Sequence, residues 1–176
     1  PVSPGTFTSV AGVHGKGIRG DRKVQYAVPK EMKPSGGALS FFARPAAPWT
    51  DGKKRPRLLI SCVGGRVPGK LLNAVQVYLD YSRPRQRWEL RLLLTGESEA
   101  KGDLSIVVDA ETARAWQEAP DRWSHIIVSW NVADMLLAVD GRICTRGPKL
   151  AKTPVVVPRK LADTFSLEPE FCFDQL

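Results

Sequence analysis

The stretch from Asp121 to Arg146, DRWSHIIVSWNVADMLLAVDGRICTR, constrains the fold more than any other part of the chain. Apolar residues recur at every second position on both sides of a short polar break at 131–134. This spacing places successive side chains on opposite faces of a strand. Asp140-Gly141 is a dipeptide typical of tight hairpin turns, because both residues tolerate a positive φ. The stretch therefore predicts a β-hairpin with one face packed against a core.

Length and composition predict one all-β domain over residues 1–176. A chain of 176 residues buries roughly 70% of its extended surface on folding, which is enough for a substantial core. Its 15 glycines and 14 prolines indicate the frequent turns that many short strands need. No run approaches the ~20 apolar residues of a membrane span. The chain begins at Pro1 rather than Met, so we expect it to be processed or part of a larger chain.

The chain is strongly basic, with a formal net charge of +8 and a pI near 9.7. Such a balance favours acidic partners such as glycosaminoglycans, nucleic acid or anionic surfaces. The alternative is a domain whose Lys and Arg only solvate its surface. No DNA-binding or RNA-binding signature is present, so nucleic acid is the weaker partner class.

Four parts of the chain resemble laminin-G-like, or concanavalin A-like, jelly-roll domains. The central hairpin carries the pattern through Trp123, His125, Val128, Ser129, Trp130 and Val139-Asp140-Gly141. The opening segment 13–21, the segment 36–48 and the closing segment 171–176 match the family in the same order. The resemblance implies a two-sheet antiparallel jelly-roll sandwich and an extracellular or cell-surface location. It implies fold more strongly than function, because one fold hosts many functions.

The remaining pattern predicts further short strands and at most one short helix, at 110–118, which Pro120 ends. Gly64-Gly65 is interpreted as a turn, 82–87 as a hairpin loop and 165–167 as an edge strand. Seven apolar side chains are predicted to be buried: Phe41, Ile60, Val77, Leu92, Val128, Leu137 and Val139.

No catalytic pattern is present in the sequence. Retaining glycosidases need two carboxylates ~5–5.5 Å apart, and the strand pattern E-x-D-x-E is absent. Glu168-Pro169-Glu170 and 97–99 are interpreted as solvated acidic turns. His14 and His125 do not form a metal site or a triad by themselves. We therefore predict that the protein is not an enzyme, with a glycan hydrolase of the same fold as a weaker alternative.

Aromatic and basic residues in or beside loops favour binding of a glycan, including an acidic polysaccharide. Sugars stack on flat apolar faces, while Arg forks suit sulfate or carboxylate groups. The main alternative for Trp88 and Trp116 is burial in the core. We predict a non-catalytic carbohydrate-binding module; the alternative is a structural or protein-interaction module that contacts neighbouring domains of a multidomain enzyme. The candidate ligand-binding residues are Trp49, Tyr81, Arg83, Arg85, Arg87, Trp88 and Trp116.

The resemblance also implies a structural Ca²⁺ held by Asp21 and Asp174. The alternative is that Asp174 caps a turn and Asp21 pairs with a neighbouring Arg, because positive charge crowds the opening segment. The three cysteines lack metal-ligand spacing, so we expect buried thiols rather than a disulfide, with one bridge as the alternative.

Overall fold

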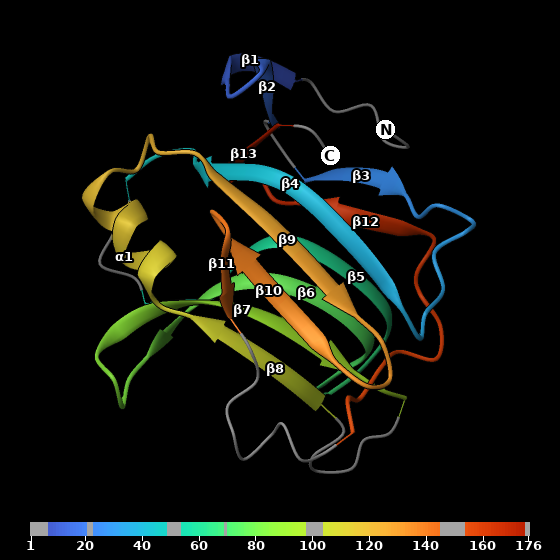
Figure 1. Ribbon diagram of the computed structural model, residues 1–176. Helices are drawn as coiled ribbons and strands as arrows, with labels where there is room; N and C mark the ends of the chain where they lie inside the picture. The colour runs from blue at the N-terminus through green and yellow to red at the C-terminus, as the bar shows by residue number, and fades with distance from the viewer. Residues whose placement is uncertain are drawn as a thin grey trace.

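The computed structural model describes residues 7–20, 23–48, 54–68, 70–97, 104–144 and 154–174. Within these residues the chain forms two antiparallel sheets and one helix (Figure 1). The first sheet contains β1 (Phe7–Gly12), β2 (Gly15–Gly20), β4 (Gly37–Pro45), β9 (Ser124–Trp130), β10 (Met135–Val139), β11 (Arg142–Cys144) and β13 (Phe171–Asp174). The second contains β3 (Val24–Ala27), β5 (Arg57–Val67), β6 (Lys70–Ser82), β7 (Arg87–Thr95), β8 (Leu104–Asp109) and β12 (Thr164–Leu167). This is the predicted all-β sandwich.

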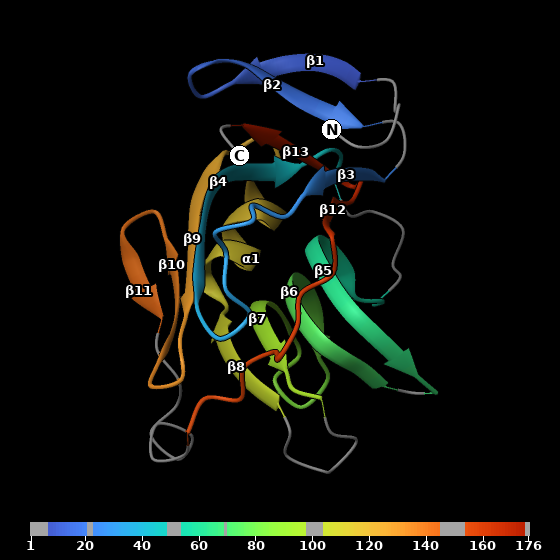
Figure 2. The ribbon, with the colours of Figure 1, turned by 90° about the vertical axis from the view of Figure 1, so that its right-hand side faces the viewer.

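The strand order interleaves distant parts of the chain. It runs β1-β2-β13-β4-β9-β10-β11 in the first sheet and β3-β12-β5-β6-β7-β8 in the second. Figure 2 shows the two sheets as two layers that face each other, with the β1–β2 hairpin across the top. The single helix, α1 (Glu111–Glu118), links β8 of the second sheet to β9 of the first.

The central hairpin forms as predicted. Strands β9 and β10 pair antiparallel, with Val128 opposite Leu137. The turn to β11 places both Asp140 (φ 51°) and Gly141 (φ 79°) in the left-handed region. Two positive φ values match the twist of the flanking strands and explain the Asp-Gly sequence.

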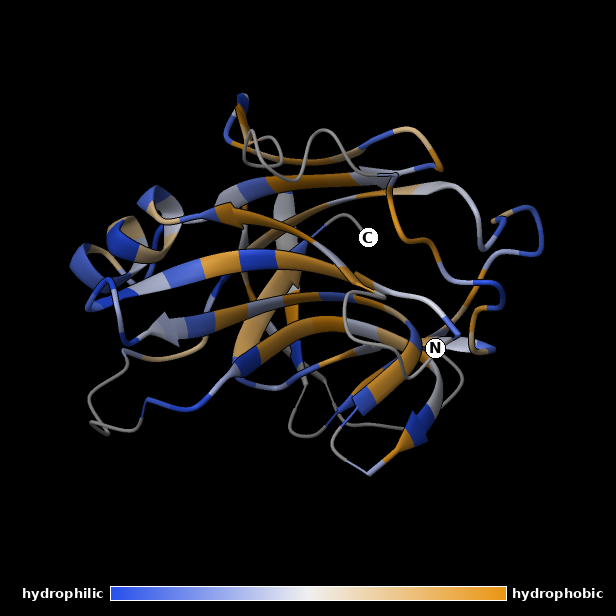
Figure 3. Ribbon diagram, turned by 90° about the horizontal axis from the view of Figure 1, so that it is seen from below, coloured by the Kyte–Doolittle hydropathy of each residue, from blue (hydrophilic) through white to orange (hydrophobic). Residues whose placement is uncertain are grey.

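The core lies between the two sheets, and all seven predicted residues belong to it. Each of them is at most 1% exposed. Val128 belongs to a core cluster that includes side chains from both sheets and from α1. Figure 3 shows hydrophobic residues along the strands and hydrophilic ones on the loops and α1. Period-2 alternation therefore identified the buried face correctly.

Two sequence interpretations are wrong. Strand β5 runs through Gly64-Gly65 instead of turning there. A Cβ on Gly64 would lie 3.0 Å from the Cβ of Asn73, whose φ is +50°, so the glycine serves close packing. Strand β12 is not an edge strand, because it pairs with both β3 and β5.

Cys62, Cys144 and Cys172 are all described, and none is bonded to another. Cys62 and Cys172 are buried. Burial raises the pKa of both thiols, so they behave as small apolar side chains. The expectation of buried thiols is thus met at these two positions, whereas Cys144 is only half-buried. Among the described helical residues, no segment has the length and apolar character that a membrane crossing needs.

Candidate ligand-binding site

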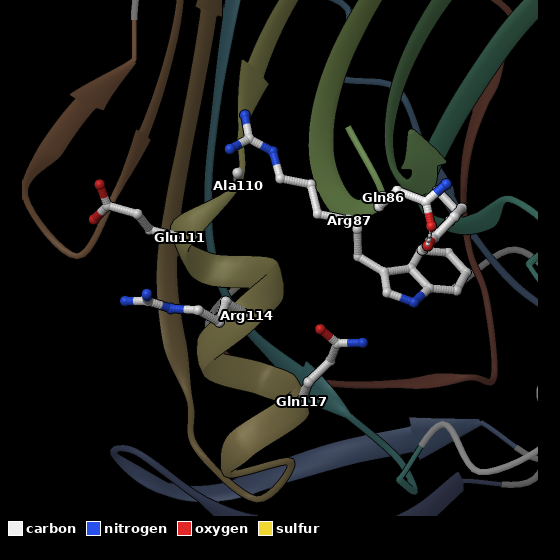
Figure 4. Close-up of a pocket in the computed structure, with 8 residues that line it drawn as sticks. Gln86, Arg87, Ala110, Glu111, Arg114 and Gln117 are labelled. Carbon is white, nitrogen blue, oxygen red and sulfur yellow. Dashed lines mark hydrogen bonds between the residues drawn. The ribbon is translucent and has the colours of Figure 1, made fainter. Parts of the chain in front are cut away.

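A cavity of about 230 Å³ lies between the β6–β7 hairpin and helix α1 (Figure 4). We call it the hairpin–helix pocket. The hairpin supplies two aromatic and two polar side chains. Helix α1 and Ala110, the residue before it, supply the rest. In Figure 4, Arg87 extends from the hairpin, while Gln117 points from α1 towards the hairpin side of the cavity. The lining residues are Tyr81, Gln86, Arg87, Trp88, Ala110, Glu111, Arg114 and Gln117.

The hairpin register builds the aromatic wall of this pocket. Tyr81 and Trp88 are direct partners across β6 and β7. Their rings meet edge to face, with centroids 5.6 Å apart, and Trp88 is only 8% exposed. The Tyr81 hydroxyl lies 3.5 Å from Oε1 of Gln86, at the hydrogen-bond limit. The pocket thus combines an apolar wall with amide and guanidinium donors, as a site for a polar ligand needs.

A buried carboxylate organises the arginines of the hairpin. Glu89 is 1% exposed and accepts hydrogen bonds from Arg85 (2.9 Å), Arg87 (3.3 Å) and Arg91 (2.9 Å). Burial by itself raises the pKa of Glu89, but these three hydrogen bonds outweigh it and hold the pKa below its ordinary value. Arg85 and Arg87 are therefore partly committed to the fold.

Asp109 fixes the position of α1. Its carboxylate accepts the backbone N–H groups of Glu111 (3.2 Å) and Thr112 (3.1 Å) and pairs with both terminal nitrogens of Arg142 on β11. Burial by itself raises the pKa of Asp109, but the hydrogen bonds from Arg142 and Thr112 lower it below its ordinary value. One side chain thereby connects β8, α1 and β11.

The structure brings together Tyr81, Arg87 and Trp88 of the predicted ligand-binding residues. Arg83 and Arg85 are exposed on the same hairpin, outside the lining of this pocket. Trp116 is 1% exposed, and its ring lies 5.9 Å from that of Phe171, so it belongs to the core.

Trp49 and Asp21 lie outside the described residues. The helical half of the pocket was not predicted. Its signal in the sequence is weak: Ala110 and Gln117 are seven residues apart and so share one side of a helix.

A pair of carboxylates lies across two neighbouring strands, and the sequence did not reveal it because only carboxylates spaced along one strand were considered. Asp80 lies opposite Glu89 in the β6–β7 register, and Arg91 bonds both. A general acid for glycoside cleavage needs a raised pKa, whereas the pKa of Glu89 is lowered. This pair is therefore poorly suited to that reaction.

The Asp174 carboxylate caps the β1–β2 turn. Its Oδ2 accepts the backbone N–H groups of Val13 (2.9 Å) and His14 (3.1 Å). Calcium prefers six to eight oxygen ligands, and the described residues contain no group of three or more His, Cys, Asp or Glu that would hold a metal. Asp174 thus acts as a turn cap, as the alternative interpretation expected, and the calcium ion stays a prediction.

We expect Asp174→Ala to destabilise the domain by about 1–3 kcal/mol, because two N–H donors lose a charged acceptor. Urea unfolding of the parent and the variant measures this. Equal midpoints would contradict the capping role. Thermal melts of the parent in EDTA and in excess Ca²⁺ test the ion separately, since a ligand of the folded state must raise stability.

No protein-family model and no curated protein matches this chain. Solved structures with a similar fold include the binding domain of Botulinum neurotoxin DC in complex with rat synaptotagmin II, at TM-score 0.52 and 9% identity. The same binding domain in complex with SialylT matches at TM-score 0.51 and 10% identity. The matches cover 96% and 98% of this chain, but only 39% and 38% of those chains. At this identity the likeness shows the fold alone, so the laminin-G-like resemblance stays a prediction at family level.

Proposed function

We propose that this protein is a non-catalytic glycan-binding module and that the hairpin–helix pocket is its binding site. The observation that carries the proposal is the convergence of Tyr81, Arg87 and Trp88 with two glutamines around one cavity. An aromatic edge beside amide and guanidinium donors offers both apolar contact and directed hydrogen bonds to sugar hydroxyls.

Further support comes from charge and from the structural neighbours. The net charge of +8 favours acidic glycans. The neighbours are binding domains, determined with rat synaptotagmin II and with SialylT. We propose an extracellular or cell-surface module, as the jelly-roll resemblance implies.

We expect Gln117→Ala and Arg87→Gln each to weaken glycan binding by roughly 2–10-fold, the value of one hydrogen bond. Because Arg87 also pairs with buried Glu89, the urea midpoint of Arg87→Gln is compared with that of the parent. An array of neutral and acidic glycans identifies a binder, and calorimetric titration then measures its affinity. Arg66→Gln is the matched control, because it removes one exposed charge at the far end of the β5–β6 hairpin.

Two outcomes would contradict the proposal or its site. A silent array overturns the proposed function. Equal losses in Arg87→Gln and Arg66→Gln point to general charge attraction, which salt screens over ~8–10 Å, rather than to the pocket. Replacing Arg83, Arg85 and Arg87 together is a poor test, because two of them neutralise buried Glu89.

A second candidate function is protein interaction through β11. This strand ends its sheet, and Ile143 on it is 62% exposed. An open strand edge can pair with a strand of a partner. A silent array, together with stabilisation of an adjoining domain that Ile143→Lys abolishes, would favour this function.

A further inference from the structure

A second cavity, of about 280 Å³, lies on the other flank of α1. We call it the helix–turn pocket, because the β10–β11 turn forms its far wall. Glu111 and Arg114 line both cavities, so the helix is the ridge between them. The lining residues of this second cavity are Glu111, Thr112, Arg114, Ala115, Arg122, Val139, Asp140 and Arg142.

Helix periodicity explains the two-sided arrangement. Ala113 and Trp116 are buried in the core, while Thr112 is buried beside Asp109 and lines the helix–turn pocket. Glu111, Arg114 and Glu118 are spaced by three and four residues, so they share the outward ridge. Gln117 then faces the hairpin–helix pocket and Ala115 the helix–turn pocket.

The size of each cavity limits what it holds alone. Pockets for drug-sized ligands start at ~300 Å³. The cavities of about 230 Å³ and about 280 Å³ both lie below that volume. Each cavity alone is therefore slightly smaller than a drug-sized ligand needs, and a ligand of that size would reach over the ridge into both.

Four arginines and two carboxylates line the two cavities, and further carboxylates next to this lining pair with the arginines. Three of the arginines are held by close partners: Arg87 by Glu89 (3.3 Å), Arg122 by Asp140 (3.3 Å) and Arg142 by Asp109 and Glu111 (3.0 Å).

Arg114 is more loosely held. Its contact with Glu118 is 3.8 Å long, and the two side chains are 75% and 70% exposed. Such exposed pairs contribute little to stability, so Arg114 is the cation on the ridge that an incoming anion can recruit.

We propose that the ligand is an acidic oligosaccharide of at least two sugar units that lies across α1, with its carboxylate or sulfate on Arg114. This inference rests on the proposed glycan-binding function. One sugar unit occupies the hairpin–helix pocket and the next occupies the helix–turn pocket. Arg114 binds the acidic group by exchanging Glu118 for it.

The test uses a heparin disaccharide and tetrasaccharide, with N-acetylglucosamine oligomers of the same lengths as neutral probes. We expect the heparin tetrasaccharide to bind at least several-fold tighter than the disaccharide. Arg114→Gln is expected to weaken tetrasaccharide binding roughly two- to tenfold. Glu118→Gln is expected to strengthen it, because it releases Arg114. The neutral probes are expected to change little in either variant.

A second Arg–Glu pair supplies matched controls. Arg159 and Glu97 form an exposed ion pair. The backbone N–H of Arg159 donates a hydrogen bond to Oδ1 of Asn73, near the start of β6. This end of β6 lies opposite the β6–β7 hairpin that lines the pocket. Arg159→Gln and Glu97→Gln make the same charge changes there and are expected to leave binding unaltered.

Equal affinities for the two heparin lengths, or equal effects of the two Arg variants, would overturn the inference while leaving the proposed function intact. If the parent bound neither the acidic nor the neutral glycans, the proposed function itself would be overturned.

Discussion

Val128→Asp is expected to leave the domain largely unfolded at room temperature. Val128 is 0% exposed and belongs to the core between the two sheets. The substitution places a carboxylate there without a partner, which costs several kcal/mol of the ~5–15 kcal/mol that stabilise a typical domain.

Urea unfolding followed by tryptophan fluorescence measures the effect. Val132→Asp is the matched control, since Val132 is 62% exposed in the loop between β9 and β10. We expect this control to unfold with the midpoint of the parent. If Val128→Asp also kept that midpoint, the assignment of the buried face of β9 would be wrong.

Asp109→Ala is expected to lower the free energy of unfolding by about 3 kcal/mol. The substitution removes the acceptor for two helical N–H groups and leaves Arg142 without its buried partner. Loss of one member of a buried pair costs ~3–5 kcal/mol, and the value falls at the lower end because Arg142 is 36% exposed. The substitution also removes the side-chain link of β8 to α1 and β11, whereas Arg142 of β11 keeps its contacts with Glu111 and Thr112 of α1.

The same carboxylate predicts a pH dependence. The folded pKa of Asp109 lies below the unfolded value of about 3.9. Its stabilisation is therefore complete above that unfolded pKa and disappears as the pH falls through the folded pKa.

Urea unfolding between pH ~7 and ~3 should give a flatter acid limb for Asp109→Asn than for the parent. Asp121→Asn, at an exposed position, is expected to keep the slope of the parent. Parallel curves for Asp109→Asn and the parent would show that this carboxyl does not contribute to acid unfolding.

The sequence predicted best what is local. The central hairpin and the core follow from period-2 alternation and from Asp140-Gly141, both of which are encoded within a few residues. The position of β12 was not predictable in the same way, because its partners in β3 and β5 lie more than a hundred residues earlier in the chain.

The candidate site divides along the same line. Tyr81 and Trp88 flank a short hairpin loop, so their proximity is local and was predicted. Arg114 and Gln117 come from α1, whose packing beside that hairpin depends on Asp109 and on tertiary contacts. Trp116 shows that residue type alone does not identify a binding residue. Its side chain enters the core, whereas Gln117, the next residue of the helix, lines the pocket.

The strand order has a consequence for biosynthesis. Strand β12 lies between β3 and β5, and β13 lies between β2 and β4. Neither sheet can close until residues 164–174 have emerged from the ribosome. Until then, β4 and β5 present unpaired strand edges, which are templates for association with other chains. We expect folding to be slow and to finish only after β13 has been synthesised, with holdase chaperones raising the yield of folded protein.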